Sequence, residues 1–234
     1  MPVKVKLPNK LPKKPPKKPK KLPKVPLMSE PEDEVEAENE KEEEEEIKIR
    51  WINLHTILYE SGVLFLTKNI TRKNGNRLIG LIIHLALYNP TRDIYLFINC
   101  ATGSARTAVA VFDAIQTVPP KVNTVGCGMT AAVGSLILLA GDMRLGYPRV
   151  RVMVYKPKPK RYNFKKGTLR GFFHKQEIVT YINDVIDEIF VARTGQPYDI
   201  IKKDLAEGLC MSAKEAQDYG IIDLITSEFN FDLI

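Results

Sequence analysis

Short runs of apolar residues alternate with segments of helical periodicity along most of the chain after residue 47. The runs have the length and composition of buried strands, and they are Val63–Leu66, Asp93–Cys100, Val122–Cys127 and Val150–Val154. The segments with apolar residues every three or four positions are predicted to be helices, and they are Leu78–Leu87, Ser104–Val118 and Thr130–Ala140. Because each strand is joined to the next helix by a short connection, the pattern predicts an α/β fold with a largely parallel sheet.

The last third of the chain predicts two more helices. Leu169–Arg193 is a long amphipathic helix with more apolar residues than one face holds, so it is either a core helix or one that also packs against a neighbouring subunit. Gly195 is suited to its C-terminal cap. Ser212–Glu215 is a capping box that opens a helix ending before Gly220, and a closing strand is predicted over Ile221–Ile225.

The first 47 residues have a different composition. Residues 1–27 contain ten lysines and eight prolines, and residues 29–46 are rich in glutamate. Such segments bury too little apolar surface to fold, which predicts a disordered tail over 1–47 and one domain over 48–234. The basic arm is either a solvated leader or a docking segment for an acidic surface or nucleic acid. It lacks the interleaved aromatic residues that stack on bases, so nucleic acid is not expected as a partner.

Charge and cysteine usage narrow the function classes. The formal net charge is +7, and counting the two parts separately gives −1 for residues 1–47 and +8 for residues 48–234. The apolar stretch Ala131–Ala140 is about half as long as a bilayer-spanning helix, so no membrane span is expected. The three cysteines form no CxxC pair and the three histidines are scattered, which predicts a reducing compartment and no metal site.

The most promising place for chemistry is Gly128–Gly134, where a buried strand, a glycine turn and a helix of small residues follow one another. This geometry presents one side chain above a sheet, beside helix amides that can stabilise an oxyanion. The stretch where a nucleophile would be expected contains mainly alanine. Thr130 and Ser135 flank it, but a shift of two or three residues on a helix rotates a side chain by roughly 200° or 300° and so points it elsewhere.

Several segments together resemble the proteolytic subunit of the ATP-dependent Clp protease, a serine peptidase family. They are DIYLFIN at 93–99, VPPKVNT at 118–124, GMTAAVGSLILLAG at 128–141, RVMVYKP at 151–157, RTGQP at 193–197 and MSAKEAQDYGIIDLI at 211–225. The resemblance covers about Leu58–Ile225 and is greatest to the plastid-encoded type, which needs no import signal. It implies a ClpP/crotonase-like fold of repeated strand–helix units with a long handle helix.

The resemblance also implies where the family's Ser-His-Asp triad would fall. The serine position is Ala132, the histidine position is Tyr155 and the aspartate position is Gly208, so all three are substituted. The backbone amides that hold the oxyanion map to Gly103 and Val133. The glycine-rich loop before them has become Cys100–Gly103, which alters its first glycine to threonine.

From this resemblance the chain is expected to be a ClpR-like, non-catalytic subunit of a mixed Clp protease complex in the chloroplast stroma. Its expected partners are other Clp subunits in stacked seven-membered rings, an AAA+ unfoldase and protein substrates. No cofactor is expected for this chain, because the partner unfoldase uses the ATP.

Three alternatives remain open from the sequence. One is an active Clp-type endopeptidase with a relocated nucleophile at Ser104, Ser135 or Cys100, or with Lys156 as a base. Another is a crotonase-like enzyme, which would need a surface for coenzyme A and a carboxylate near Gly103. The last is a nucleic-acid binder that acts through the lysine arm. His174, on the long helix, is interpreted as a surface or interface residue.

Overall fold

The computed structural model describes residues 24–28, 49–156 and 168–227, and the chain divides into two units, Met1–Ile57 and Leu58–Ile234. The first unit contains an antiparallel pair, β1 (Lys24–Met28) and β2 (Ile49–Asn53). The division into a disordered tail over 1–47 and one domain over 48–234 stays a prediction, although β1 falls within that tail. The apolar residues of β1 suit a strand, and Pro26 is tolerated because an edge strand can lack one donor. The rest of the predicted tail lies outside the described residues.

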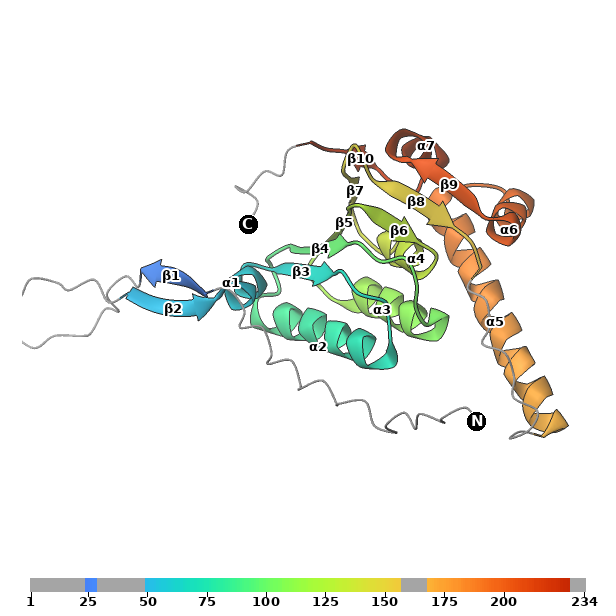
Figure 1. The fold of residues 1–234 in the computed structure, drawn as a ribbon, viewed down its shortest axis with the longest axis horizontal. Coiled ribbons are helices and arrows are strands. Elements are labelled where there is room, and N and C mark those ends of the chain that lie inside the picture. Colours follow the sequence, from blue (N-terminus) through green and yellow to red (C-terminus); the bar gives the residue numbers. More distant parts are fainter. Residues whose placement is uncertain (1–23, 29–48, 157–167, 228–234) are drawn as a thin grey trace, which may run out of the picture. The chain divides into compact units, whose positions relative to one another are not determined.

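The second unit is an α/β fold, as predicted (Figure 1). Its larger sheet has the order β10-β7-β5-β4-β3 in the described part of the chain, and every neighbouring pair is parallel. These strands are β3 (Val63–Leu66), β4 (Ile94–Ile98), β5 (Val122–Gly126), β7 (Arg144–Gly146) and β10 (Leu224–Ile225). A smaller sheet contains β6 (Met129–Ala131), β8 (Arg151–Val154) and β9 (Leu209–Ser212).

The described helices are α1 (Leu54–Glu60), which crosses the boundary between the units, α2 (Arg72–Tyr88), α3 (Ala105–Thr117), α4 (Val133–Leu138), α5 (Leu169–Thr194), α6 (Tyr198–Glu207) and α7 (Ala213–Tyr219). The sequence did not predict α1 or α6, and the other five follow the predicted order. The caps predicted from sequence are confirmed: Gly195 is left-handed after α5, and Ser212 and Glu215 form the capping box of α7.

Three elements begin three or more residues away from their predicted starts, and the largest difference is at α2, which begins at Arg72 instead of Leu78. The predicted start of the helix over Thr130–Ala140 was wrong, because Met129–Ala131 pair with β8 and α4 begins only at Val133. The closing strand predicted over Ile221–Ile225 is reduced to Leu224–Ile225. The amides of Ile221 and Ile222 donate instead to the Ala216 carbonyl at the end of α7, which removes them from the sheet.

The larger sheet buries different residues on its two faces. Leu64, Leu96 and Ile98 belong to the main core together with residues of the helices. Alternate positions on the other face form a smaller cluster to which no described helix contributes. One apolar residue from each strand lies in register across this face. We call this set the apolar row, and it consists of Phe65, Phe97, Val125, Leu145 and Leu224.

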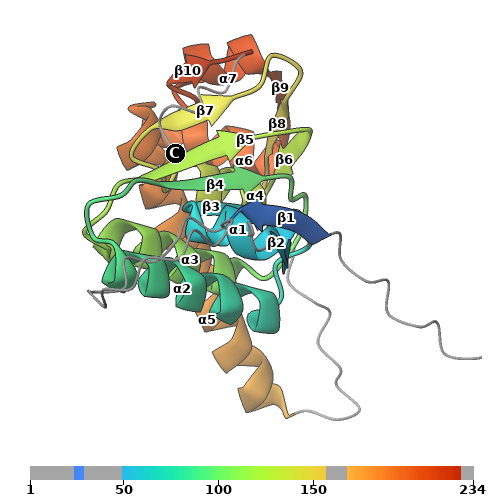
Figure 2. The ribbon, with the colours of Figure 1, turned by 90° about the vertical axis from the view of Figure 1, so that its left-hand side faces the viewer.

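The long helix α5 is buried over only part of its length. Its buried residues, Ile186, Asp187 and Phe190, all lie in the second half. The first half exposes large apolar side chains, among them Phe173 and Tyr181. Figures 1 and 2 both show this half projecting beyond the rest of the second unit.

Candidate functional site

A strained turn lies between β6 and α4. Ala132 has φ 47° and ψ −104°, and it is the only non-glycine residue with positive φ among those described. Such a backbone conformation costs of order 1–3 kcal/mol for a residue with a Cβ, so the surroundings must enforce it. The Ala132 amide donates to Met153 O (2.9 Å), and the Ala132 carbonyl accepts from the Leu136 amide (3.1 Å) and the Ser135 hydroxyl (2.7 Å).

The Cys100–Gly103 loop lies directly beside this turn. The Ala131 amide donates to Cys100 O (2.9 Å), and a Cβ on Gly134 would lie 2.2 Å from the same carbonyl oxygen. Gly103 forms a parallel bridge with Ile70, and a Cβ on Gly103 would lie 2.7 Å from that residue's Cβ. Glycine at both positions therefore allows the close approach of α4 and of the Ile70 segment to the loop.

Two backbone donors at this place have no acceptor among the described residues. They are the amides of Gly103 and Val133, the positions that the sequence assigned to an oxyanion hole. The neighbouring amides are used: Ser104 donates to Ile70 O (2.8 Å) and Ile70 donates to Thr102 O (3.1 Å). These two hydrogen bonds form the parallel bridge between Ile70 and Gly103.

The structure brings the two other predicted triad positions together. Antiparallel pairing of β8 with β9 matches Val154 to Leu209, so Tyr155 and Gly208 follow as neighbours. A Cβ on Gly208 would lie 3.7 Å from the Tyr155 Cβ. The Tyr155 hydroxyl donates to Ala101 O (3.1 Å), so the phenol reaches from the end of β8 to the Cys100–Gly103 loop.

This arrangement lacks the groups that acyl transfer requires. The methyl group of Ala132 cannot attack a carbonyl, and Gly208 has no side chain to orient a base. The Tyr155 phenol donates to a backbone carbonyl instead of facing a nucleophile. The turn therefore has the backbone of a strand–turn–helix nucleophile site, with no side-chain nucleophile at Ala132.

The proposed replacement nucleophiles are either buried and hydrogen-bonded to the backbone or exposed without a base beside them. The Ser135 hydroxyl is buried and donates to backbone oxygens of Ala132 and Met153. Cys100 is 2% exposed, and its burial raises the pKa of the thiol, which disfavours the reactive thiolate. Ser104 is exposed at the start of α3, where no histidine hydrogen-bonds to it.

The candidate bases also have partners other than a serine hydroxyl. His174 is exposed on α5 and lies 3.8 Å from Glu177, as expected of a surface residue. His84, which lies on α2, stacks between the rings of Tyr59 and Tyr88. Lys156 Nζ bonds to the Asp187 carboxylate at 2.7 Å, which engages the lysine as an ion-pair partner.

The pairing of Lys156 with Asp187 was not predicted from the sequence. Asp187 is 1% exposed on α5, and its second carboxylate oxygen, Oδ1, has no hydrogen-bond partner. A signal was available, because Asp187 falls between Ile186 and Phe190 on the apolar stripe of that helix. A carboxylate on a buried stripe indicates a paired charge.

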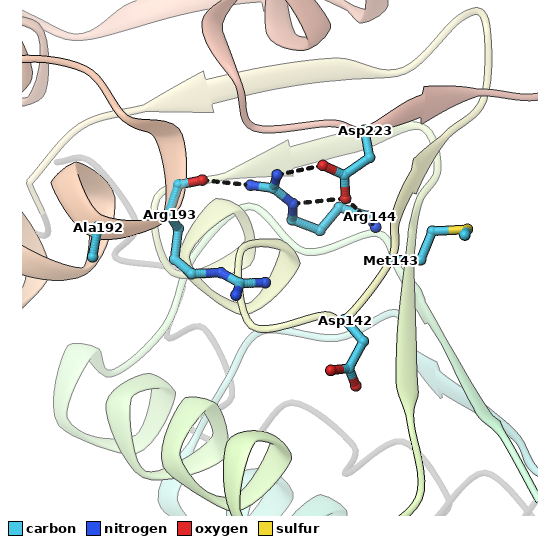
Figure 3. Close-up of a pocket in the computed structure, with 6 residues that line it drawn as sticks. All are labelled: Asp142, Met143, Arg144, Ala192, Arg193 and Asp223. Carbon is cyan, nitrogen blue, oxygen red and sulfur yellow. Dashed lines mark hydrogen bonds and ion pairs between the residues drawn. The ribbon is translucent and has the colours of Figure 1, made fainter.

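A separate cavity of about 310 Å³ lies between β7, the end of α5 and the segment before β10 (Figure 3). Arg144 pairs with Asp223 and also donates to the carbonyls of Arg193 (2.9 Å) and Gly220 (2.7 Å). Arg193 donates to the carbonyls of Leu139 (2.7 Å) and Gly141, just after α4. These bonds tie together four elements and involve none of the triad positions.

Two features are absent from the described residues. No group of three or more histidine, cysteine, aspartate or glutamate side chains there is placed to hold a metal ion. No helix in the described ranges is both long and apolar enough to cross a bilayer.

Comparison with known proteins gives a consistent result. Residues 43–229 match the Clp protease family. The chain is 36% identical over 180 residues to the ATP-dependent Clp protease proteolytic subunit of Pinus contorta, which covers 76% of this chain and 86% of that protein. It is 34% identical over 186 residues to the same subunit of Nuphar advena (79% and 91%) and 36% identical over 179 residues to that of Vitis vinifera (76% and 90%).

Proposed function

The chain belongs to the Clp protease family, and on that premise we propose that it is a non-catalytic subunit that occupies a position in a mixed Clp ring. The strained turn at Ala132 carries this proposal, because the fold keeps a costly backbone conformation where the nucleophile is missing. Substitution of Tyr155 and Gly208 at the other triad positions supports it. An enzyme of this kind that has lost its whole triad typically accelerates the reaction only about 10³- to 10⁴-fold over the uncatalysed reaction in water.

The exposed half of α5 supports the assembly part of the proposal. Leu169, Phe173 and Tyr181 are large and exposed there, on a helix that projects from its unit. Contiguous exposed apolar surface is typical of protein interfaces. We propose that other Clp subunits cover this half of α5 in stacked rings.

The apolar row supports docking of an AAA+ unfoldase at the exposed ends of the row, on the face of the larger sheet to which no described helix contributes. Phe65 is 45% exposed and stacks on Phe97, with ring centroids 5.4 Å apart. Leu224 is also exposed at the other end of the row. The unfoldase would consume the ATP, so this chain needs no cofactor. The proposed site of action is the plastid, in keeping with plant and algal relatives.

The decisive experiment measures activity and assembly together. The purified chain, alone and mixed with active Clp subunits, is assayed with a fluorogenic peptide, labelled with a serine-directed probe and weighed as a native complex by mass spectrometry. We expect no hydrolysis and no label for the chain alone, because Ala132 has no nucleophilic atom and Ser135 and Cys100 donate to backbone carbonyls. We also expect the chain to be incorporated in mixed complexes. An active Clp subunit is the positive control.

Two results would contradict the proposal separately. Hydrolysis by the isolated chain, with the probe mapped to Ser104 or Ser135, would show a relocated nucleophile. Absence of the chain from every mixed complex would refute the ring assignment even if the chain proved inactive.

A further inference from the structure

The smaller sheet has sulfur-containing side chains on one of its faces. Its strands β6, β8 and β9 lie side by side in that order (Figure 1). Successive side chains of a strand point to opposite faces of a sheet. The residues on one face are each at most 3% exposed, and they include Thr130, Val152, Val154 and Met211. The alternate positions form the other face, which carries Met129 of β6, Met153 of β8 and Cys210 of β9.

The strand register brings these three side chains together. Met153 pairs with Cys210 in the antiparallel ladder and with Ala131 in the parallel one. Residues directly opposite in an antiparallel ladder have Cβ atoms about 4.5–5.5 Å apart. Met129 lies two residues before Ala131 on the same face, which makes it a diagonal neighbour of Met153, at about 7–8 Å. Because a methionine side chain has three rotatable bonds, its sulfur can cover that distance.

The three sulfur atoms are accessible and are not needed for the core. Met129 is 44% exposed, Met153 is half-buried and Cys210 is exposed. All three cysteines are free, but the thiols of Cys100 and Cys127 donate to backbone carbonyls. Exposed thioether and thiol groups gain little from burial, so packing does not explain their arrangement on this face. We call Met129, Met153 and Cys210 the sulfur triplet.

We propose that the sulfur triplet binds a copper(I) ion. Thioethers and thiolates are soft ligands that select Cu(I), and β6, β8 and β9 contain no histidine, aspartate or glutamate that would favour a harder metal ion. As the copper–sulfur bond forms, the Cys210 thiol releases its proton to solvent, so thiolate and Cu(I) balance in charge. The spacing of cysteines and histidines in the sequence predicted no metal site, because it takes no account of methionines that strand pairing brings beside a cysteine.

The test measures Cu(I) binding to the full chain without oxygen, in competition with bicinchoninate, which forms a coloured Cu(I) complex. Cys210→Ser and Met153→Leu each remove one sulfur from the triplet. Cys127→Ser and Met143→Leu are the matched controls, and Met143 is 50% exposed. Loss of a group that merely supports a ligand weakens metal binding about 10- to 100-fold. We therefore expect Cys210→Ser to weaken binding by about tenfold or more, Met153→Leu to weaken it several-fold, and both controls to match the parent chain.

X-ray absorption of the bound copper gives a second readout, and we expect sulfur neighbours whose number falls in Cys210→Ser. Equal binding by the two cysteine variants, or by the two methionine variants, would overturn the proposal, since the triplet would then not be the site. Tighter binding of Zn²⁺ than of Cu(I) in a parallel titration would overturn the assignment to a soft ion. The substituted side chains of the triplet are not fully buried, so the variants should remain folded, and their melting temperatures are measured to check this.

Discussion

The triad positions have diverged unequally at the level of single residues. The turn at Ala132 still has the backbone conformation that presents a side chain above a sheet. Gly208, in contrast, has φ 87° and ψ 111°, a conformation that residues with a Cβ rarely adopt. A serine at position 132 would therefore suit the present backbone, whereas an aspartate at 208 would be strained.

Replacing Gly208 by alanine should measure that strain. Its added Cβ would make only an ordinary contact with Tyr155, at 3.7 Å, so the cost comes from the backbone. We expect Gly208→Ala to lower the free energy of unfolding by about 1–2 kcal/mol in chemical denaturation.

Gly80 on α2 provides the control for this measurement. A Cβ there meets nothing within 4 Å, and the position is helical, so Gly80→Ala should raise the free energy of unfolding by about 0.5–1 kcal/mol. A stabilising effect at both positions would show that the left-handed conformation at Gly208 is not required.

Sequence motifs predicted the triad positions but not the contacts that these residues make. Counting along matching segments placed Ala132, Tyr155 and Gly208, and the structure brings the last two within van der Waals distance of each other. The hydrogen bond from Tyr155 to Ala101 joins residues 54 positions apart in the chain. No local pattern specifies such a bond, because it depends on how β8 and the loop meet in the fold.

At the scale of elements, local sequence patterns were sufficient to place β3 and the C-terminal ends of α5 and α7, but not the start of α2. The buried strand β3 has the predicted bounds, and α5 and α7 end at the predicted glycines. The short strands β6 and β9 were missed because pairing with β8, not their own composition, makes them extended. Tertiary contacts therefore decided the structure around the candidate site.

The pairing of Arg144 with Asp223 should make the junction of β7 and β10 sensitive to acid. Burial alone would raise the pKa of Asp223, but the hydrogen bonds and charge of Arg144 outweigh it and lower that pKa. A lowered pKa in the folded state means that the ionised carboxylate stabilises the fold. This contribution is present at neutral pH and is lost as the pH falls through the folded-state pKa.

We expect Asp223→Asn to lower the free energy of unfolding by about 1 kcal/mol at neutral pH, because Arg144 would lose its charged partner. The difference from the parent chain should shrink below about pH 4, where aspartate becomes protonated. Denaturation curves across this pH range test both statements.

Asp218→Asn is the matched control, since Asp218 pairs with Lys214 on the exposed surface of α7. Its effect should be negligible at every pH. A pH-independent effect of Asp223→Asn would indicate that the amide merely repacks the junction.

At the scale of the whole molecule, unfoldase docking should depend on the apolar row. Phe65→Ser removes an exposed ring from the row, and Ile200→Ser removes an equally exposed apolar side chain (45%) from α6. In mixed complexes, retention of the unfoldase on a column should fall several-fold for Phe65→Ser, because burial of a ring in an interface contributes about 1–3 kcal/mol. Retention should be unchanged for Ile200→Ser.

Loss of the unfoldase from both variants, or from neither, would count against the row as its docking surface. Peptide hydrolysis by the active subunits of the same complexes controls for ring integrity. That activity should be equal in both variants, since small peptides need no unfolding.

The strained turn at Ala132 has a consequence for dosage. If the scaffold persists without its nucleophile, the number of cutting centres in an assembly and the number of filled places become independent quantities. Each copy of this chain would then dilute proteolytic capacity without leaving a gap in the wall. A cell could adjust turnover of its proteins by changing the ratio of interchangeable parts.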